Sequence, residues 1–414
     1  MLRLGCMCGL VLGCVPLMAQ SPGTVQQLEA EARQDLAARN ASGALAAYEK
    51  LAALVPRSAI YQDQIGFLLA TLKRTEEAIP HFERATELDG NLAVAWFHLG
   101  AAQLMNRQAE AGIRDLQKAV ALKPNDADYR FRLGSAYNDT GQYAAAITEL
   151  AKAAKQLPKN AAVWEALATA FQQQNRLKEA REAYRQAVAL DPKNVAVRNS
   201  YGYVLVNTGD PTGGLREFRR ILAQDPNNVH VQVNVGYAYI GAGDFQEAIK
   251  QLIQVTRAHP EAADAHYDLG VAYKQSDDLV HARAELEETV KLEPSLAEAH
   301  YMLAMTYVDL GETGKAVGQL RAAVEQRRDY ADAWFGLGTL LKQQEDVDGA
   351  IDALRHSVAL DDKDAGAFNT LGLLLKRKGD TEGAKQAFAR AAELRQEEEQ
   401  EKERKLWVGA GKAQ

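Results

Sequence analysis

Small and large apolar positions recur along the chain at a fixed interval of 34 residues. Each interval holds two stretches in which apolar residues return every three or four positions, which is the spacing of one helical face. Two amphipathic helices are therefore predicted in every interval. Rows of 34 residues fill 25–398 without an insertion. They begin at residues 25, 59, 93, 127, 161, 195, 229, 263, 297, 331 and 365.

Three columns of this arrangement, counted from the first residue of each row, predict how the two helices pack. Columns eight and twenty hold only glycine or alanine, and column twenty-four holds only a large apolar residue, as in Gly236, Ala248 and Leu252. Antiparallel helices approach closely only where neither carries bulk at the crossing. The large residue lies one helical turn beyond the small one on the same face, so we expect it to fill the space beside the crossing.

Glycine and proline mark the predicted helix ends. Glycine at column fifteen indicates that the first helix ends in a left-handed turn, and proline at column thirty-two stops the second helix. Pro80 lies inside a second helix and predicts a local bend. The last row has no proline at column thirty-two, so its second helix is expected to run on to about Trp407. The glycines are Gly141, Gly209, Gly243, Gly311 and Gly379, and the prolines are Pro56, Pro124, Pro158, Pro192, Pro226, Pro260 and Pro294.

These columns resemble the tetratricopeptide repeat, whose pattern is Trp-x2-Leu-Gly-x2-Tyr, then Ala-x3-Phe, then Pro. The resemblance implies an all-α solenoid, a right-handed superhelix of about eleven helix-turn-helix repeats over 25–398. It also implies that the first helices line a concave groove, in which columns two, five, nine and twelve hold extended peptides or partner helices. The first row departs from the pattern, with Glu31 and Asp35 where apolar residues belong.

The candidate groove residues form a strip of aromatic, thioether and amide side chains. Large rings with a polar tip suit a binding groove, and asparagine amides can anchor a peptide main chain. The alternative is that these side chains only pack one helix against the next. The asparagines are too scattered for the ladder that some family members use, and no row has the lysine–asparagine pair of a carboxylate clamp. The candidates are Phe97, Phe131, Asn199, Tyr203, Asn234, Tyr237, Tyr267, Tyr301, Met305 and Phe335.

The two ends of the chain lie outside the repeat pattern. Residues 1–19 have the pattern of a secretory signal, with one arginine, an apolar run and a small residue, which predicts cleavage after Ala19. The competing interpretations are a lipid anchor at Cys14, because 11–14 resemble a lipobox, and an uncleaved anchor. No later segment approaches the apolar length that crosses a bilayer. Residues 399–414 are expected to form a charged helical extension and tail.

Composition and motifs narrow the chemistry. A net charge of −7 without a basic stripe argues against a nucleic-acid partner. All three cysteines lie before residue 15, and the chain has no HExxH, Gly-x-Ser-x-Gly or GxxxxGK[ST] motif. His266 and His300 share column four of neighbouring rows; packing is their expected role and a two-histidine metal site the alternative. We therefore predict no catalytic, cofactor or metal site.

The predicted function is that of a non-enzymatic scaffold or adapter in the bacterial cell envelope. The protein would be periplasmic or secreted, and it would hold a protein or peptide segment in the groove. A glycan-binding component of polysaccharide export or cell-wall machinery is the alternative, because exposed tyrosine and tryptophan can stack on sugar rings. An enzyme would need a catalytic constellation that these motifs do not supply, and a cytosolic scaffold would fit if residues 1–19 are not a signal.

Overall fold

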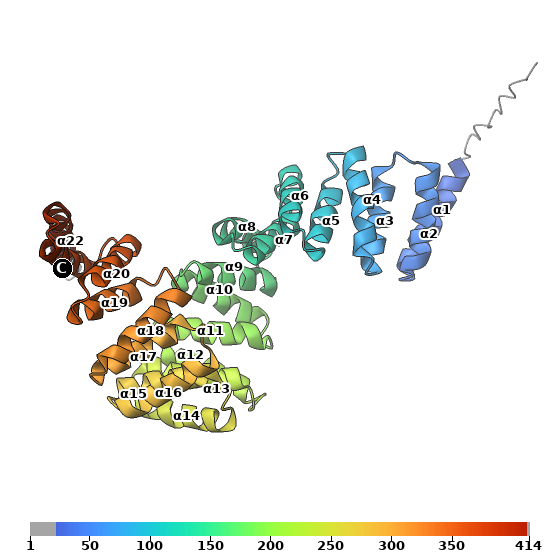
Figure 1. Ribbon diagram of the computed structural model, residues 1–414. Helices are drawn as coiled ribbons and strands as arrows, with labels where there is room; N and C mark the ends of the chain where they lie inside the picture. The colour runs from blue at the N-terminus through green and yellow to red at the C-terminus, as the bar shows by residue number, and fades with distance from the viewer. Residues whose placement is uncertain (1–21, 412–414) are drawn as a thin grey trace, which may run out of the picture. The chain divides into compact units, whose positions relative to one another are not determined.

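The computed structural model describes residues 22–411, which form helices joined by short turns and contain no strand (Figure 1). From the second row onward every first helix begins at column one, and in all rows every second helix begins at column seventeen. The 34-residue period of the sequence is therefore the period of the fold. Residues 1–19, with the predicted signal and its alternatives, lie outside the described residues.

The chain divides into two compact units, one up to Val197 and one from Arg198 onward, with the boundary inside α11 (Val195–Asn207). The first unit holds α1 (Pro22–Ala37), α2 (Ala41–Leu54), α3 (Ala59–Thr71), α4 (Thr75–Leu88), α5 (Ala93–Met105), α6 (Ala109–Leu122), α7 (Ala127–Asp139), α8 (Tyr143–Gln156), α9 (Ala161–Gln173) and α10 (Leu177–Leu190). The second holds α12 (Pro211–Leu222), α13 (Val229–Ala242), α14 (Phe245–Ala258), α15 (Ala263–Gln275), α16 (Leu279–Leu292), α17 (Ala297–Asp309), α18 (Thr313–Gln326), α19 (Ala331–Gln343), α20 (Val347–Leu360), α21 (Ala365–Lys378) and α22 (Thr381–Gly411).

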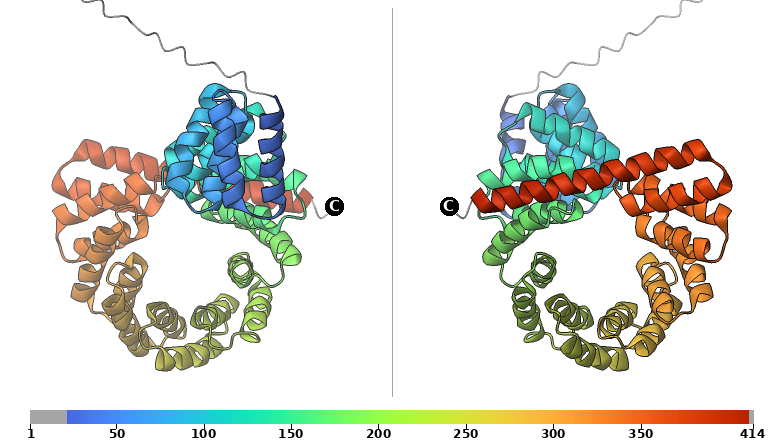
Figure 2. Two further views of the ribbon diagram at one scale, coloured as in Figure 1. Left: turned by 90° about the vertical axis from the view of Figure 1, so that its right-hand side faces the viewer. Right: turned by 90° about the vertical axis from the view of Figure 1, so that its left-hand side faces the viewer.

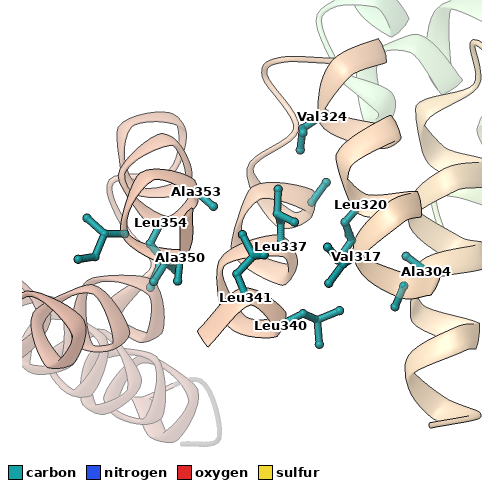
Figure 3. Packing of buried hydrophobic residues seen from close by; sticks show 14 of the residues in the cluster. Ala304, Val317, Leu320, Val324, Leu337, Leu340, Leu341, Ala350, Ala353 and Leu354 are labelled. Carbon is teal, nitrogen blue, oxygen red and sulfur yellow. The ribbon is translucent and has the colours of Figure 1, made fainter. Parts of the chain in front are cut away.

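The two helices of each repeat cross closely at the small residues. A methyl group added at Gly236 would lie 2.5 Å from Cγ of Leu252, and one at Gly66 would lie 2.7 Å from Cδ1 of Phe82. The large residue of column twenty-four therefore covers the bare backbone of column eight, as the sequence predicts. Figure 3 shows the same packing in the second unit, where Ala304 of α17 lies beside Leu320 of α18.

The turn between the two helices is left-handed in every repeat. Column fifteen has positive φ at five glycines, with values from 74° to 88°, which confirms the predicted turn. The same conformation occurs at six residues that carry a side chain, with φ from 56° to 64°, where it costs roughly 1–2 kcal/mol each. These six are Arg39, Lys73, Arg107, Asn175, Asp277 and Glu345.

Seven of the loops between repeats are closed by the side chain at column four. Its ring or side-chain nitrogen forms a hydrogen bond with the backbone carbonyl six residues earlier, at column thirty-two. The carbonyls of Gly90 and Arg328 are bonded in the same way as those of the prolines. α18 and α20 end at Gln326 and Leu360 although no proline follows at column thirty-two. The bonds run from Trp96 to Gly90 (3.0 Å), Arg130 to Pro124 (2.8 Å), Trp164 to Pro158 (3.1 Å), Gln232 to Pro226 (2.7 Å), His266 to Pro260 (3.2 Å), His300 to Pro294 (2.9 Å) and Trp334 to Arg328 (2.9 Å).

The last described helix runs through column thirty-two of its row, where Gln396 stands in place of proline. α22 continues as one rod past its partner α21, and it extends beyond Trp407 to Gly411 (Figure 2, red). α4 also runs through Pro80 as one helix, and the bend expected there stays a prediction. None of the helices between residues 22 and 411 combines the length and the apolar character that a bilayer crossing requires.

Exchanging residue types at column fifteen tests the left-handed turn. Lys73→Gly should raise the free energy of unfolding by about 1 kcal/mol, because it removes the strain of a side chain at positive φ. Gly243→Ala should lower it by a similar amount, since no atom lies within 4 Å of the added methyl and only backbone strain remains. Urea unfolding of both variants gives the two shifts. Shifts of the same sign would contradict this explanation.

Candidate binding face of the first helices

The first helices of successive repeats lie against one another within each unit. Such contacts join α3 to α5, α5 to α7 and α7 to α9 in the first unit, and α13 to α15, α15 to α17 and α19 to α21 in the second. Side chains at columns five, six, nine and thirteen meet across these contacts, and we call this surface the first-helix face. All ten predicted groove residues lie on it.

The face has a fixed register in which column five of one repeat meets column six of the next. Oδ1 of Asp63 lies 2.8 Å from Nδ1 of His98, and Nδ2 of Asn234 donates to Oδ1 of Asn199 at 2.8 Å. Both pairs are separated by 35 residues. The sequence-based view that the asparagines are scattered is therefore wrong for these two, which meet because the pairing shifts by one column between rows. One amide proton and one carbonyl are used, which leaves further donors and acceptors on each side chain.

In the first unit the face is largely occupied by its own contacts. The ring of Phe97 stacks on Tyr129, with centroids 4.5 Å apart and planes 16° apart, and Phe131 is half-buried. Asp63 is 2% exposed and engaged with His98. Nε of Arg132 is buried and has no hydrogen-bond partner among the described residues.

In the second unit a pair of tyrosines stands at the edge of the face. The rings of Tyr203 and Tyr237 stack with centroids 5.3 Å apart, and the Tyr237 hydroxyl donates to Oδ1 of Asn207 at 2.9 Å. Burial raises the pKa of Tyr237 to about 12, so its hydroxyl stays protonated at neutral pH. Tyr203 is 39% exposed, whereas the other nine predicted residues are half-buried. The solvent-facing ring of this pair is therefore that of Tyr203.

Further along the second unit the predicted residues also serve packing. Tyr267, Tyr301, Met305 and Phe335 lie against the buried cluster that extends from α16 to α22. Burial raises the pKa of Tyr267 to about 12. These side chains are therefore packed between helices with a part of each accessible, and their role in binding stays a prediction.

The turn that precedes α19 adds two residues beside Tyr301. The ring of Tyr330 lies 5.1 Å from the Tyr301 ring, and the guanidinium of Arg327 lies 3.7 Å from the Tyr330 centroid. Arg327 is also paired with Glu298 of α17. The sequence search missed both residues because it considered only the first helices, and these two belong to the loop between repeats.

Asp268 is an ionisable residue of this face that has no hydrogen-bond or ion-pair partner among the described residues. It occupies column six of α15, where the register places Val233 of α13 opposite it instead of a polar side chain. Among the described residues no hydrogen bond or ion pair involves its half-buried carboxylate. Burial, and secondarily the charge of Asp264, raises the pKa of Asp268 to about 7. Sequence reasoning missed it because Val233 and Asp268 stand in different columns.

The two histidines of column four have structural roles. Nδ1 of His266 lies 2.6 Å from a carboxylate oxygen of Glu285, and Nδ1 of His300 lies 2.6 Å from Oε1 of Gln319. Each Nε2 bonds a loop carbonyl, so both nitrogens of each ring are engaged. The bond to Glu285 raises the pKa of His266. Within residues 22–411 no group of three histidine and acidic side chains is placed to hold a metal ion.

Neutralising Asp268 tests its electrostatic surroundings. Its folded-state pKa exceeds the unfolded value near 4, so its contribution to stability is complete below pH 4 and is lost as the pH rises through about 7. Asp268→Asn should therefore gain roughly 1–3 kcal/mol of unfolding free energy relative to the native chain between pH 4 and pH 8, less than the full shift because the side chain is half-exposed. The exposed loop residue Asp362, changed to Asn, is the matched control. Parallel pH profiles for all three proteins would contradict the assignment.

Comparisons with known proteins agree with the repeat architecture. Tetratricopeptide repeat models match residues 61–92, 103–170, 239–306, 301–365 and 365–398. The model described as the TPR domain of cytochrome c-type biogenesis protein H matches residues 150–267. A comparison with curated proteins finds no match.

Three similar solved structures share between 15% and 26% sequence identity with this chain. A crystal structure of MamA is 26% identical with a TM-score of 0.38, and the match covers 40% of this chain and 97% of that one. Yeast Tom70 is 16% identical with a TM-score of 0.48 over 91% of this chain and 93% of its own. A tetratricopeptide repeat protein from Parabacteroides merdae is 15% identical with a TM-score of 0.48 over 60% and 98%.

The conserved geometry of the repeats and the family matches lead to one assignment. Paired helices of constant length, the small-residue crossing and the repeated left-handed turn extend through the described residues. The family models together cover most of 61–398. The chain belongs to the tetratricopeptide repeat family, and its fold is an all-α solenoid.

Proposed function

We propose that this chain is a non-enzymatic adapter that binds a segment of a partner protein on the first-helix face of its second unit. Tetratricopeptide repeat proteins bind protein partners, which makes adapter function the natural starting point. The observation that supports this particular surface is the combination of a tyrosine pair with one exposed ring, asparagines with spare hydrogen-bonding groups and an unpaired carboxylate.

The chemistry of the face suits a peptide. An extended segment exposes backbone N–H and C=O groups, which the remaining donor and acceptor groups of Asn199 and Asn234 can satisfy. The Tyr203–Tyr237 pair offers apolar area with little conformational entropy to lose on binding. No observation favours a glycan over a peptide, because the faces of these two rings are turned toward each other.

The proposed place of action is the cell envelope. Its support is the signal pattern of residues 1–19, with a lipid anchor at Cys14 as the competing arrangement. An envelope adapter would meet exported proteins whose segments are extended before or after folding. Such segments have the backbone groups that the face is suited to hold.

Site-specific photocross-linking in intact cells tests the proposal. p-Benzoylphenylalanine at position 203 should cross-link a protein partner, because Tyr203 is the exposed ring of the face. The same group at position 280 should not, since Val280 is 59% exposed but lies on the second helix α16. Cross-linking at both positions, or at neither, would contradict the proposed surface.

The N-terminal residue of the protein purified from these cells tests the proposed export. Cleavage after Ala19 leaves Gln20 first, and lipoprotein processing leaves a modified Cys14 first. A product that begins at Met1 would contradict export with cleavage, without bearing on the binding surface.

A further inference from the structure

The unpaired carboxylate of Asp268 indicates the chemistry of the partner. We propose that the bound segment carries a lysine or arginine whose cationic end pairs with Asp268, an inference that rests on the proposed function of the first-helix face. The argument depends on the register of the face, on the side chains around Asp268 and on the charge of the neighbouring repeats.

The register shows that Asp268 occupies a position at which two other repeats pair their own polar groups. At the equivalent position of other repeats His98 meets Asp63 and Asn234 meets Asn199. Opposite Asp268 the chain has Val233, which is 4% exposed and offers no hydrogen-bonding side chain. A half-buried carboxylate without a partner is costly, and a cation supplied by a ligand would remove that cost.

Tyrosine rings lie on both neighbouring positions of the face. Burial raises the pKa of both Tyr237 of α13 and Tyr267 of α15, and the charge of nearby Asp268 adds to the rise at each hydroxyl. Such rings can hold the aliphatic stem of a lysine or the plane of a guanidinium, and they favour a cation over an apolar side chain. The surroundings of Asp268 therefore match the two parts of a long basic side chain.

Column two of the helices α15, α17 and α19 is acidic. Asp264, Glu298 and Asp332 occupy column two of α15, α17 and α19. Asp332 is exposed and has no ion pair among the described residues, and the link from Asp264 to the exposed His230 is long at 3.7 Å. The cations beside this surface are occupied, because Arg327 pairs with Glu298 and Lys274 pairs with Asp309. Charge complementarity therefore selects a basic segment over an acidic or neutral one.

The affinity of the proposed interaction is expected to depend on pH, because binding of a cation is linked to loss of the proton of Asp268. Because Asp268 ionises only near neutral pH, a cation that pairs with it must also displace its proton in mildly acidic solution. Among the groups that face it, Asp264 is acidic and Tyr237 and Tyr267 stay neutral through this range. The affinity for a basic segment should therefore rise between pH 6 and pH 8.

Peptide selection followed by a double-mutant cycle tests the inference. A displayed library of random twelve-residue peptides is selected against the full mature chain, against Asp268→Asn and against the control Asp362→Asn. Selection against the native chain and against the control should enrich peptides that share a lysine or arginine at one position. Selection against Asp268→Asn should not favour a basic residue at any position. Replacing that residue by glutamine in the best synthetic peptide should weaken binding about tenfold on the native chain and about twofold or less on Asp268→Asn, because the charge-assisted contact is already lost there.

The outcomes separate this inference from the proposed function. Peptides that bind the native chain and Asp268→Asn equally, with no shared basic position, would overturn the inference and leave the face as a peptide site. No peptide enriched against the native chain would count against the proposed function itself. If Asp268→Asn binds no peptide, its circular dichroism and thermal unfolding show whether the variant has unfolded. A folded variant that still binds peptides lacking a basic residue supports the inference.

Discussion

The close crossing of two helices at glycine and alanine is the constraint on which the structure depends. It fixes the separation of the helices in each repeat, because a methyl group at most of the glycines of column eight would collide with the large residue of column twenty-four. With the left-handed turn at column fifteen and the bonded loop carbonyl at column thirty-two, it makes every repeat the same size. Equal repeats stack in one register, and that register brings the first helices of successive repeats together.

The first-helix face follows from this register. Most positions on it are used by the array itself, through ring stacking, the asparagine pair and the Asp63–His98 contact. Function is proposed where this internal pairing is incomplete, at Asp268 and at the exposed ring of Tyr203. Pairing of its own polar groups stabilises the array, and the proposed binding specificity rests on the few groups that it leaves unpaired.

Features that depend on a single column of the repeat can be predicted from the sequence. Contacts between residues of different columns cannot. Helix starts, the small-residue crossing and the glycine turns were all predictable because each depends on one residue type at one position. The left-handed residues such as Lys73 were not, since nothing in a charged side chain indicates positive φ. The Asn199–Asn234 pair and the Val233–Asp268 mismatch were also missed, because the contact between repeats shifts by one column and becomes visible only once the helices are placed.

The most direct test of the account is a crystal structure of the chain with a selected basic peptide bound. The account predicts that the peptide lies along α13 and α15 of the second unit and that its lysine or arginine nitrogen is within about 3 Å of a carboxylate oxygen of Asp268. A peptide bound along the second helices, or one whose basic residue points into solvent away from Asp268, would contradict it.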